Sequence, residues 1–288
     1  MSAEASQETT PRAASAAPAA RAREARRIPT AGGAFQDMFA ERIGAIDLTD
    51  LDPAAFPEAV LILARQVWQE RARTEYRSIQ IMSRFLGELA GAGEAPEILA
   101  SAIDLVEDEV RHAAYCAALT QHLGGVALLP DPLELDDPET FLRAPMQERA
   151  LHSAITMLAV NETISVAYVE DLRARCTTPA VLRLLEATVA DEAVHQELGW
   201  AYVKMALARF SRSTLPSWRH LVELTLKPHR ESIGRVLDKL PPRDRHPDRH
   251  ADRELVALGL YSDARQALVG HAAIERRVLP RLRELELA

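Results

Sequence analysis

Two copies of a Glu-x-x-His motif lie in stretches of the sequence that otherwise have the apolar pattern of buried helices. The first copy is DEVRH at residues 108–112, and the second is DEAVH at residues 191–195. A glutamate and a histidine three positions apart share one face of an α-helix, so both side chains can reach the same metal ion. Either copy alone is a weak signal, but the repeat at matching places in two apolar stripes predicts a metal site.

A single glutamate precedes each motif, again in the middle of an apolar stripe. Glu75 lies 34 residues before Glu109, and Glu162 lies 30 residues before Glu192. This separation suits an antiparallel hairpin of two helices of about 25 residues each, in which residues near the middle of both helices meet at one level. The pattern therefore predicts that each half of the site combines a lone glutamate with one motif.

Other acids compete with the two lone glutamates. Glu70 is the alternative to Glu75, but its neighbours on the helix surface are polar, which favours a solvated position for Glu70. Glu170 and Asp171 are the alternatives to Glu162, but both lie nearer the end of the expected helix. We therefore prefer Glu75 and Glu162 as members of the site.

Charge balance indicates which ions such a site would hold. An ionised carboxylate that is buried without a partner is strongly destabilising, and carboxylates at one level of a core also repel one another. Two divalent cations would neutralise four carboxylates, and oxygen ligands with one imidazole per ion suit iron or manganese. We expect two iron ions, with mixed manganese–iron or two manganese ions as alternatives. The expected ligands are Glu75, Glu109, His112, Glu162, Glu192 and His195.

Four amphipathic segments are expected to position these side chains. Apolar residues recur at helical spacing over residues 57–88, 96–122, 147–175 and 179–209. Short connections join the first segment to the second and the third to the fourth, whereas the Pro-rich residues 124–146 are long enough to cross the length of a bundle. The sequence thus predicts an all-α four-helix bundle with one long crossover connection, over about residues 55–210.

This combination resembles the ferritin-like di-metal carboxylate superfamily over about residues 57–209. With an Asp before each Glu, the motifs are similar to those of multicomponent monooxygenase hydroxylases and, in part, ribonucleotide reductase small subunits. The stretches DEVRHAAYC, NETISVAY and ADEAVHQELGWAYVKMAL also resemble bacterial ferritin-like-domain proteins. The resemblance implies that Asp108 and Asp191 each accept a hydrogen bond from the ligand histidine of the opposite helix, as a metal-bound imidazole requires. The alternative is that both are surface acids.

Several neighbouring residues have two interpretations. Arg111 is either part of the hydrogen-bonded surroundings of the metal ligands or a plain ion-pair partner of Asp108. Cys116 lies one turn beyond His112, where a protein like the ribonucleotide reductases would carry a radical tyrosine, so a cysteine argues against radical storage despite adjacent Tyr115. Cys116 is more simply a small core residue. The residues that could line an apolar substrate pocket, or else belong to the core, are Met82, Cys116, Leu158, Val166 and Val169.

Composition limits the remaining possibilities. The net charge of −8 disfavours nucleic acid as a partner, and no apolar run reaches the roughly 18–20 residues of a membrane span. Two cysteines imply no disulfide framework, so we expect a cytoplasmic protein. Residues 1–33 lack apolar periodicity and are expected to be a disordered tail. Residues 211–288 are expected to form a helical extension that packs on the bundle and covers the site, shapes a pocket or forms a dimer contact.

The leading functional hypothesis is a non-haem di-iron oxidoreductase that activates O2 to oxidise a small organic substrate. Such an enzyme needs an electron donor, either a reductase or a ferredoxin, and we expect a homodimer. The alternative is a ferroxidase that handles iron, and a metal-free structural bundle is a third possibility. The sequence does not separate hydroxylation from N-oxygenation or desaturation.

Overall fold

The part of this chain that the structure describes is mainly helical. The computed structural model describes residues 25–44 and 46–288, and within these ranges the only β pairing is a single bridge between Arg27 and Leu128. The expected disorder of residues 1–24 lies outside the described residues, whereas residues 26–29 run beside residues 127–129 of the crossover. The fold class is therefore all-α, as the sequence predicts.

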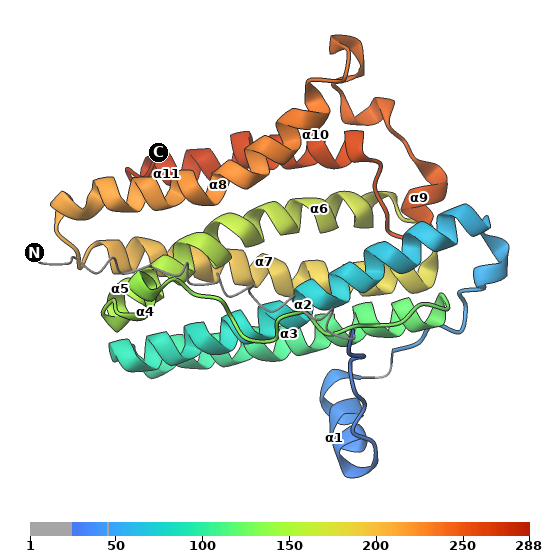
Figure 1. The fold of residues 1–288 in the computed structure, drawn as a ribbon, viewed down its shortest axis with the longest axis horizontal. Coiled ribbons are helices and arrows are strands. Elements are labelled where there is room, and N and C mark those ends of the chain that lie inside the picture. Colours follow the sequence, from blue (N-terminus) through green and yellow to red (C-terminus); the bar gives the residue numbers. More distant parts are fainter. Residues whose placement is uncertain (1–24, 45) are drawn as a thin grey trace, which may run out of the picture.

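Four long helical segments form two antiparallel hairpins (Figure 1). Pro96 and Pro179 occupy the first turn of their helices. Proline has no backbone N–H, and in the first turn an N–H would have no helical carbonyl to bond to. Gly93 ends the first helix in the left-handed conformation that glycine adopts without strain. The segments are α2 (Glu58–Ala92), α3 (Pro96–His122), the continuous run α5 (Met146–Ser153), η2 (Ala154–Asn161) and α6 (Glu162–Arg175), and α7 (Pro179–Leu207). The arrangement is compatible with a ferritin-like bundle.

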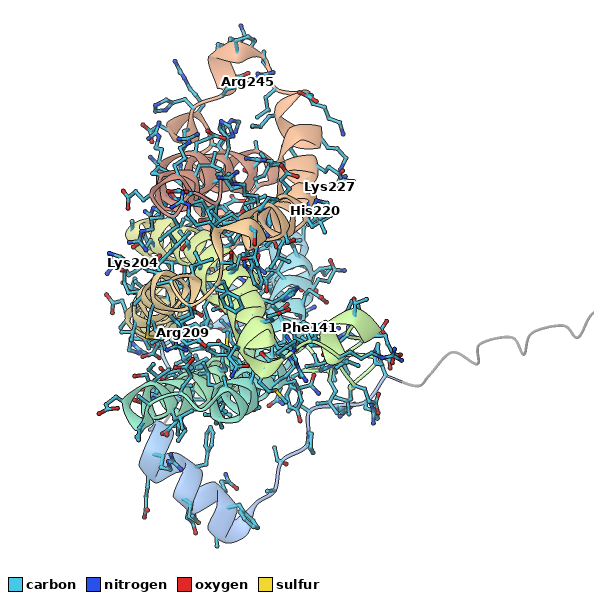
Figure 2. All side chains as sticks on the ribbon, turned by 90° about the vertical axis from the view of Figure 1, so that its left-hand side faces the viewer. Phe141, Lys204, Arg209, His220, Lys227 and Arg245 are labelled. Carbon is cyan, nitrogen blue, oxygen red and sulfur yellow. The ribbon has the colours of Figure 1, made fainter. Side chains whose placement is uncertain are left out.

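The crossover between the hairpins runs along the side of α2 and contains the short helix α4 (Glu139–Leu142). Arg77 of α2 donates a 3.0 Å hydrogen bond to the carbonyl of Leu133, and Arg84 pairs with Asp137. Phe141, which Figure 2 labels on α4, packs against His152 with ring centroids 4.8 Å apart. These contacts hold a connection that has little regular structure of its own.

The core of the bundle consists of two apolar clusters on either side of a polar layer. On α2, Ala72 belongs to one cluster and Met82 to the other, with Glu75 between them. The π-helix η2 ends directly before Glu162, and π segments of this kind occur often at functional sites. A Cβ added at Gly199 of α7 would lie 2.5 Å from the Cβ of Leu158 in η2, so only glycine permits this close approach of the two helices.

The C-terminal residues form a further layer that covers η2 and α6 (Figure 1). Arg265 is buried and pairs with Asp171 of α6 at 2.6 Å, and the hydroxyl of Tyr261 donates to the carbonyl of Tyr168 at 2.7 Å. The loop that carries Arg245 lies at the far edge of this layer (Figure 2). The elements are η3 (Arg212–Thr214), α8 (Leu215–Leu237), η4 (Pro242–Asp244), η5 (Pro247–Arg249), α9 (Arg253–Ala257), α10 (Asp263–Ala273), η6 (Ile274–Val278) and α11 (Leu279–Glu284).

Two short elements precede the bundle, namely α1 (Gly33–Ile43) and η1 (Pro53–Ala55). Helix α1 projects from the hairpin of α2 and α3 and buries none of its residues, although Arg42 pairs with Glu107 of α3 (Figure 1). Phe35 and Met38 of α1 are largely exposed. None of the described helices has both the length and the apolar character required to cross a membrane.

Candidate metal centre

Six side chains from four helical segments converge in the polar layer. Both motifs lie near the middle of their helices, and the two lone glutamates come from α2 and from the first residue of α6. Five of the six side chains are buried, and the sixth, Glu75, is partly exposed towards a cavity. The six residues are Glu75, Glu109, His112, Glu162, Glu192 and His195.

The two histidines face the same pair of glutamates. The Nδ1 atom of His112 lies 3.4 Å from Glu192 Oε1 and 3.9 Å from Glu109 Oε2. The Nδ1 atom of His195 lies 3.6 Å from Glu192 Oε2 and 3.7 Å from Glu109 Oε1. Glu109 and Glu192 are thus each shared between two imidazoles, which suits carboxylates that bridge two cations.

The outward nitrogens of the histidines hydrogen-bond across the bundle. Nε2 of His112 lies 3.1 Å from Asp191 on α7, and Nε2 of His195 lies 3.1 Å from Asp108 on α3. This is the cross-helix pairing that the resemblance implies. A carboxylate partner keeps the proton on Nε2, so that the lone pair of Nδ1 points inward.

Arg111 joins the two aspartates. Its Nη1 atom donates to Asp108 at 2.8 Å and to Asp191 at 2.7 Å. The two interpretations of Arg111 therefore coincide, because the ion pair with Asp108 is itself part of the hydrogen-bonded surroundings of both histidines. The guanidinium fixes the two aspartates relative to each other and balances part of their charge.

Burial and mutual repulsion shape the protonation of the glutamates. Burial, followed by the charge of neighbouring carboxylates, raises the pKa of Glu109 and of Glu162 well above the ordinary value. Burial also raises the pKa of Glu75, although the positive charge of His112 opposes this. For Glu192 burial acts in the same direction, but the imidazoles of His112 and His195 beside it prevail and hold its pKa low. The cluster thus lacks positive charge to balance all its carboxylates.

The unpaired atoms of the cluster fit a pair of metal ions. Buried side-chain atoms without a hydrogen-bond partner include Glu109 Oε2, Glu192 Oε2 and both histidine Nδ1 atoms. Such orphan atoms are rare in folded proteins, and in this case they are lone-pair donors that face one another. The ligand atoms form two groups, and within each group they lie within 4.8 Å of one another. The groups are Glu75 with His112 and Glu192, and Glu109 with Glu192 and His195. Glu162 belongs to neither group, and the charge of neighbouring Glu192 helps to raise its pKa.

The competing acids have other partners on the surface of the bundle. Glu70 is exposed and lies 3.5 Å from Arg73. Glu170 pairs with Arg277 at 2.7 Å, and Asp171 pairs with Arg265 of the C-terminal layer. The preference for Glu75 and Glu162 in the polar layer agrees with these positions.

A cavity of about 310 Å³ borders the cluster at Glu75. Cys116 and Val169 line it, as the sequence suggested, whereas Met82, Leu158 and Val166 are fully buried core residues and do not. Burial, together with the nearby charge of Glu75, raises the pKa of the Cys116 thiol well above its ordinary value. The lining residues are Trp68, Arg71, Thr74, Glu75, Tyr115, Cys116, Ser165, Tyr168, Val169, Leu172, Leu184, Leu185, Thr188, Tyr261 and Gln266.

Some of these lining residues were missed by the sequence reasoning. Arg71 carried a usable signal, because it is three residues after Trp68 and four before Glu75 and so shares a helix face with both. Tyr261 and Gln266 carried none, since they reach the cavity from the C-terminal layer through tertiary packing. The extension therefore shapes a pocket, which is one of the three roles expected for it.

Comparison of the chain with protein-family models, with curated proteins and with solved structures gives no match. The class that fold and site define is thus an all-helical protein with a buried carboxylate–histidine cluster that could bind metal ions.

Proposed function

We propose that this protein is an O2-dependent oxidoreductase that binds two iron ions in the polar layer and oxidises a small organic substrate in the adjoining cavity. The observation that carries the proposal is the cluster of unpaired lone-pair donors on Glu109, His112, Glu192 and His195, with a cavity directly beside it. A structural ion pair would leave no such orphan atoms, and a purely structural metal would need no cavity.

The residues of the centre have distinct tasks in this proposal. His112 and His195, oriented by Asp191 and Asp108, would each bind one ion through Nδ1. Glu75, Glu109, Glu162 and Glu192 would supply the carboxylate oxygens that hold the two ions and balance their charge. When bound, the iron ions would supply the binding and reduction of O2.

Other residues around the metal centre would form the wall of the substrate cavity. The aliphatic side chains of Val169, Leu172 and Leu185 line the cavity and keep water away from the reacting atoms. Glu75 faces both the cluster and the cavity, which makes it the ligand nearest to a bound substrate. The neutral thiol of Cys116 would remain a wall residue and would not compete for the metal as a thiolate.

The proposal includes partners that the chain itself does not contain. Reduction of the irons requires an electron donor such as a reductase or a ferredoxin, and the expected homodimer and cytoplasmic location remain predictions. Manganese, alone or with iron, remains the alternative metal, because the same oxygen and nitrogen donors suit it. A ferroxidase would use the same six ligands, and the two functions differ in what is consumed after O2 is added.

Anaerobic loading with Fe(II) followed by exposure to O2 tests the proposal. We expect two irons per chain, oxidation of these two only, and no continued consumption of added Fe(II). Uptake and oxidation of many irons per chain would instead favour the ferroxidase. A chain that binds no metal, together with a Glu109→Ala variant of unchanged metal content and stability, would contradict both.

A further inference from the structure

Arg71 is a charged side chain in the cavity wall that lacks an acidic partner. Its guanidinium carbon lies 4.4 Å from the centroid of the Trp68 ring, and no hydrogen bond or ion pair joins it to another described residue. Buried Arg265, by contrast, makes two hydrogen bonds to Asp171. Arg71 is only partly exposed, and its guanidinium donors have no acceptor among the described residues, so inside the cavity they are available to the anionic group of a ligand.

The surroundings of Arg71 hold it in place. Trp68, on which it stacks, donates a 2.8 Å hydrogen bond from Nε1 to the carbonyl of Leu258. The next residue, Gly259, adopts a positive φ of 69°, and a Cβ there would lie 2.9 Å from the Trp68 ring and 3.7 Å from Arg71 Nη1. The C-terminal layer thus packs against Trp68 and Arg71 and leaves the guanidinium partly exposed in the cavity. Burial lowers the pKa of Arg71, although the nearby Cys116, Tyr261 and Glu75 oppose this.

Glu75 and Arg71 attract each other electrostatically but do not form a direct ion pair. The two residues are one turn apart on α2, yet they form no ion pair, and Glu75 belongs to one of the two metal-ligand groups. Arg71 and Glu75 therefore mark two different places in the same cavity. One offers positive charge for an anion, and the other borders the candidate metal centre.

The rest of the wall defines what lies between these two places. Aliphatic groups of Leu172, Leu184 and Leu185 line the cavity, together with the hydroxyl-bearing Thr74 and Thr188. A volume of about 310 Å³ admits a small molecule only. The chemistry of the wall matches a compact ligand with one anionic group and a largely apolar body.

A second, outer cleft of about 560 Å³ lies between α8 and α10 and shares two wall residues, Tyr168 and Gln266, with the inner cavity. Its basic lining includes Arg235 and Lys239, against one acid, Asp263. On a chain of net charge −8, a locally basic cleft at this position would attract small anions.

We propose that the cavity binds a small organic carboxylic acid, whose carboxylate pairs with Arg71 and whose apolar body extends towards Glu75. The acid enters by the cleft between α8 and α10, past Tyr168 and Gln266. That the bound acid is oxidised rests on the proposed function, for which this inference names the class of substrate. That the acid binds in the cavity rests on Arg71 and does not require the metal.

The probes are hexanoate and benzoate, each compared with its uncharged amide, added to the full chain both metal-free and loaded anaerobically with Fe(II). Calorimetry measures affinity, and the fluorescence of Trp68 beside Arg71 gives a second readout. We expect both acids to bind at least tenfold more tightly than their amides. Arg71→Gln should weaken binding of the acids by about 10- to 100-fold and leave the amides unchanged. Arg73→Gln, on the same helix but paired with Glu70, is the matched control.

Equal affinity of acids and amides, failure of wild type to bind either acid, or acid binding unaffected by Arg71→Gln would overturn the inference. Metal content separates this result from the proposed function. A chain that takes up no iron yet binds acids through Arg71 contradicts only the proposed function, whereas iron uptake without acid binding contradicts only the inference.

The entry route has its own variant. Arg235→Glu combined with Lys239→Glu should slow association of hexanoate about tenfold at low salt and leave its dissociation rate unchanged. These residues line the outer cleft and do not line the inner cavity. An unchanged association rate would refute entry by this cleft.

Discussion

Replacement of Asp108 by alanine should weaken metal binding without any change to a metal ligand. Asp108 lies 3.1 Å from Nε2 of His195 and accepts a 2.8 Å hydrogen bond from Arg111. Without Asp108 the imidazole of His195 loses the acceptor that fixes its tautomer and ring orientation. Hydrogen-bond partners of metal-bound histidines typically contribute 10–100-fold to metal affinity, which corresponds to about 1.4–2.7 kcal/mol.

Competition between the protein and a chelator for Fe(II) under anaerobic conditions measures this effect. We expect the ion bound through His195 to lose about 10–100-fold in affinity and the ion bound through His112, which keeps Asp191, to change less. Asp108→Asn retains an acceptor oxygen and should recover part of the loss. Glu107→Ala is the matched control, because Glu107 is adjacent in sequence but pairs with Arg42 on the surface.

An Asp108→Ala variant that binds both ions as tightly as the wild type would refute the reasoning. Circular dichroism and thermal unfolding of the metal-free variant show whether any loss arises from misfolding. If Glu107→Ala and Asp108→Ala weakened binding equally, the effect would reflect the local negative charge and not the hydrogen bond to His195.

Two further predictions concern stability. The pKa values of Glu109 and Glu162 are raised in the folded state, so their contribution to stability is fully present below the unfolded value of about 4.5 and is lost as pH rises through the folded values. The melting temperature of metal-free protein should accordingly fall as pH rises above about 4.5, and the stabilisation by added Fe(II) should grow as it does. A metal-free melting temperature that rises with pH over this range would contradict the repulsion argument. Gly199→Ala should destabilise the protein by about 1–3 kcal/mol in chemical denaturation, because its Cβ would lie 2.5 Å from that of Leu158. Gly87→Ala, where a Cβ meets nothing within 4 Å, should instead stabilise α2 by about 0.5–1 kcal/mol, and equal effects of the two substitutions would refute the packing argument.

Local signals explain why much of the helical framework could be predicted. Pro96 and Pro179 mark helix starts that the structure places at those same residues, and α3 ends at His122 as expected. Ser262 caps α10 by accepting a 3.4 Å hydrogen bond from the N–H of Arg265. These features depend on residues within a turn or two of each other, which the sequence displays directly.

The irregular parts of the helices could not be predicted in this way. The third segment was expected to be an unbroken α-helix, but residues 154–161 are π-helical. In the C-terminal extension, residues 274–278 are also π-helical, and the helix then continues through Pro280. Such changes of helical geometry respond to contacts with other helices, for example at Gly199, and have no strong local signal.

The sequence by itself determined the helices and the members of the candidate metal centre, because ligand spacing of three residues and apolar stripes are local consequences of helix geometry. Tertiary structure alone decided that Arg111 joins Asp108 to Asp191, that Arg71 forms no ion pair, and that Tyr261, 190 residues after Arg71 in the sequence, lines the same cavity. The physical reason is that these relations depend on how helices pack. Packing reflects the shapes of many side chains together, whereas helical periodicity reflects the backbone of one segment.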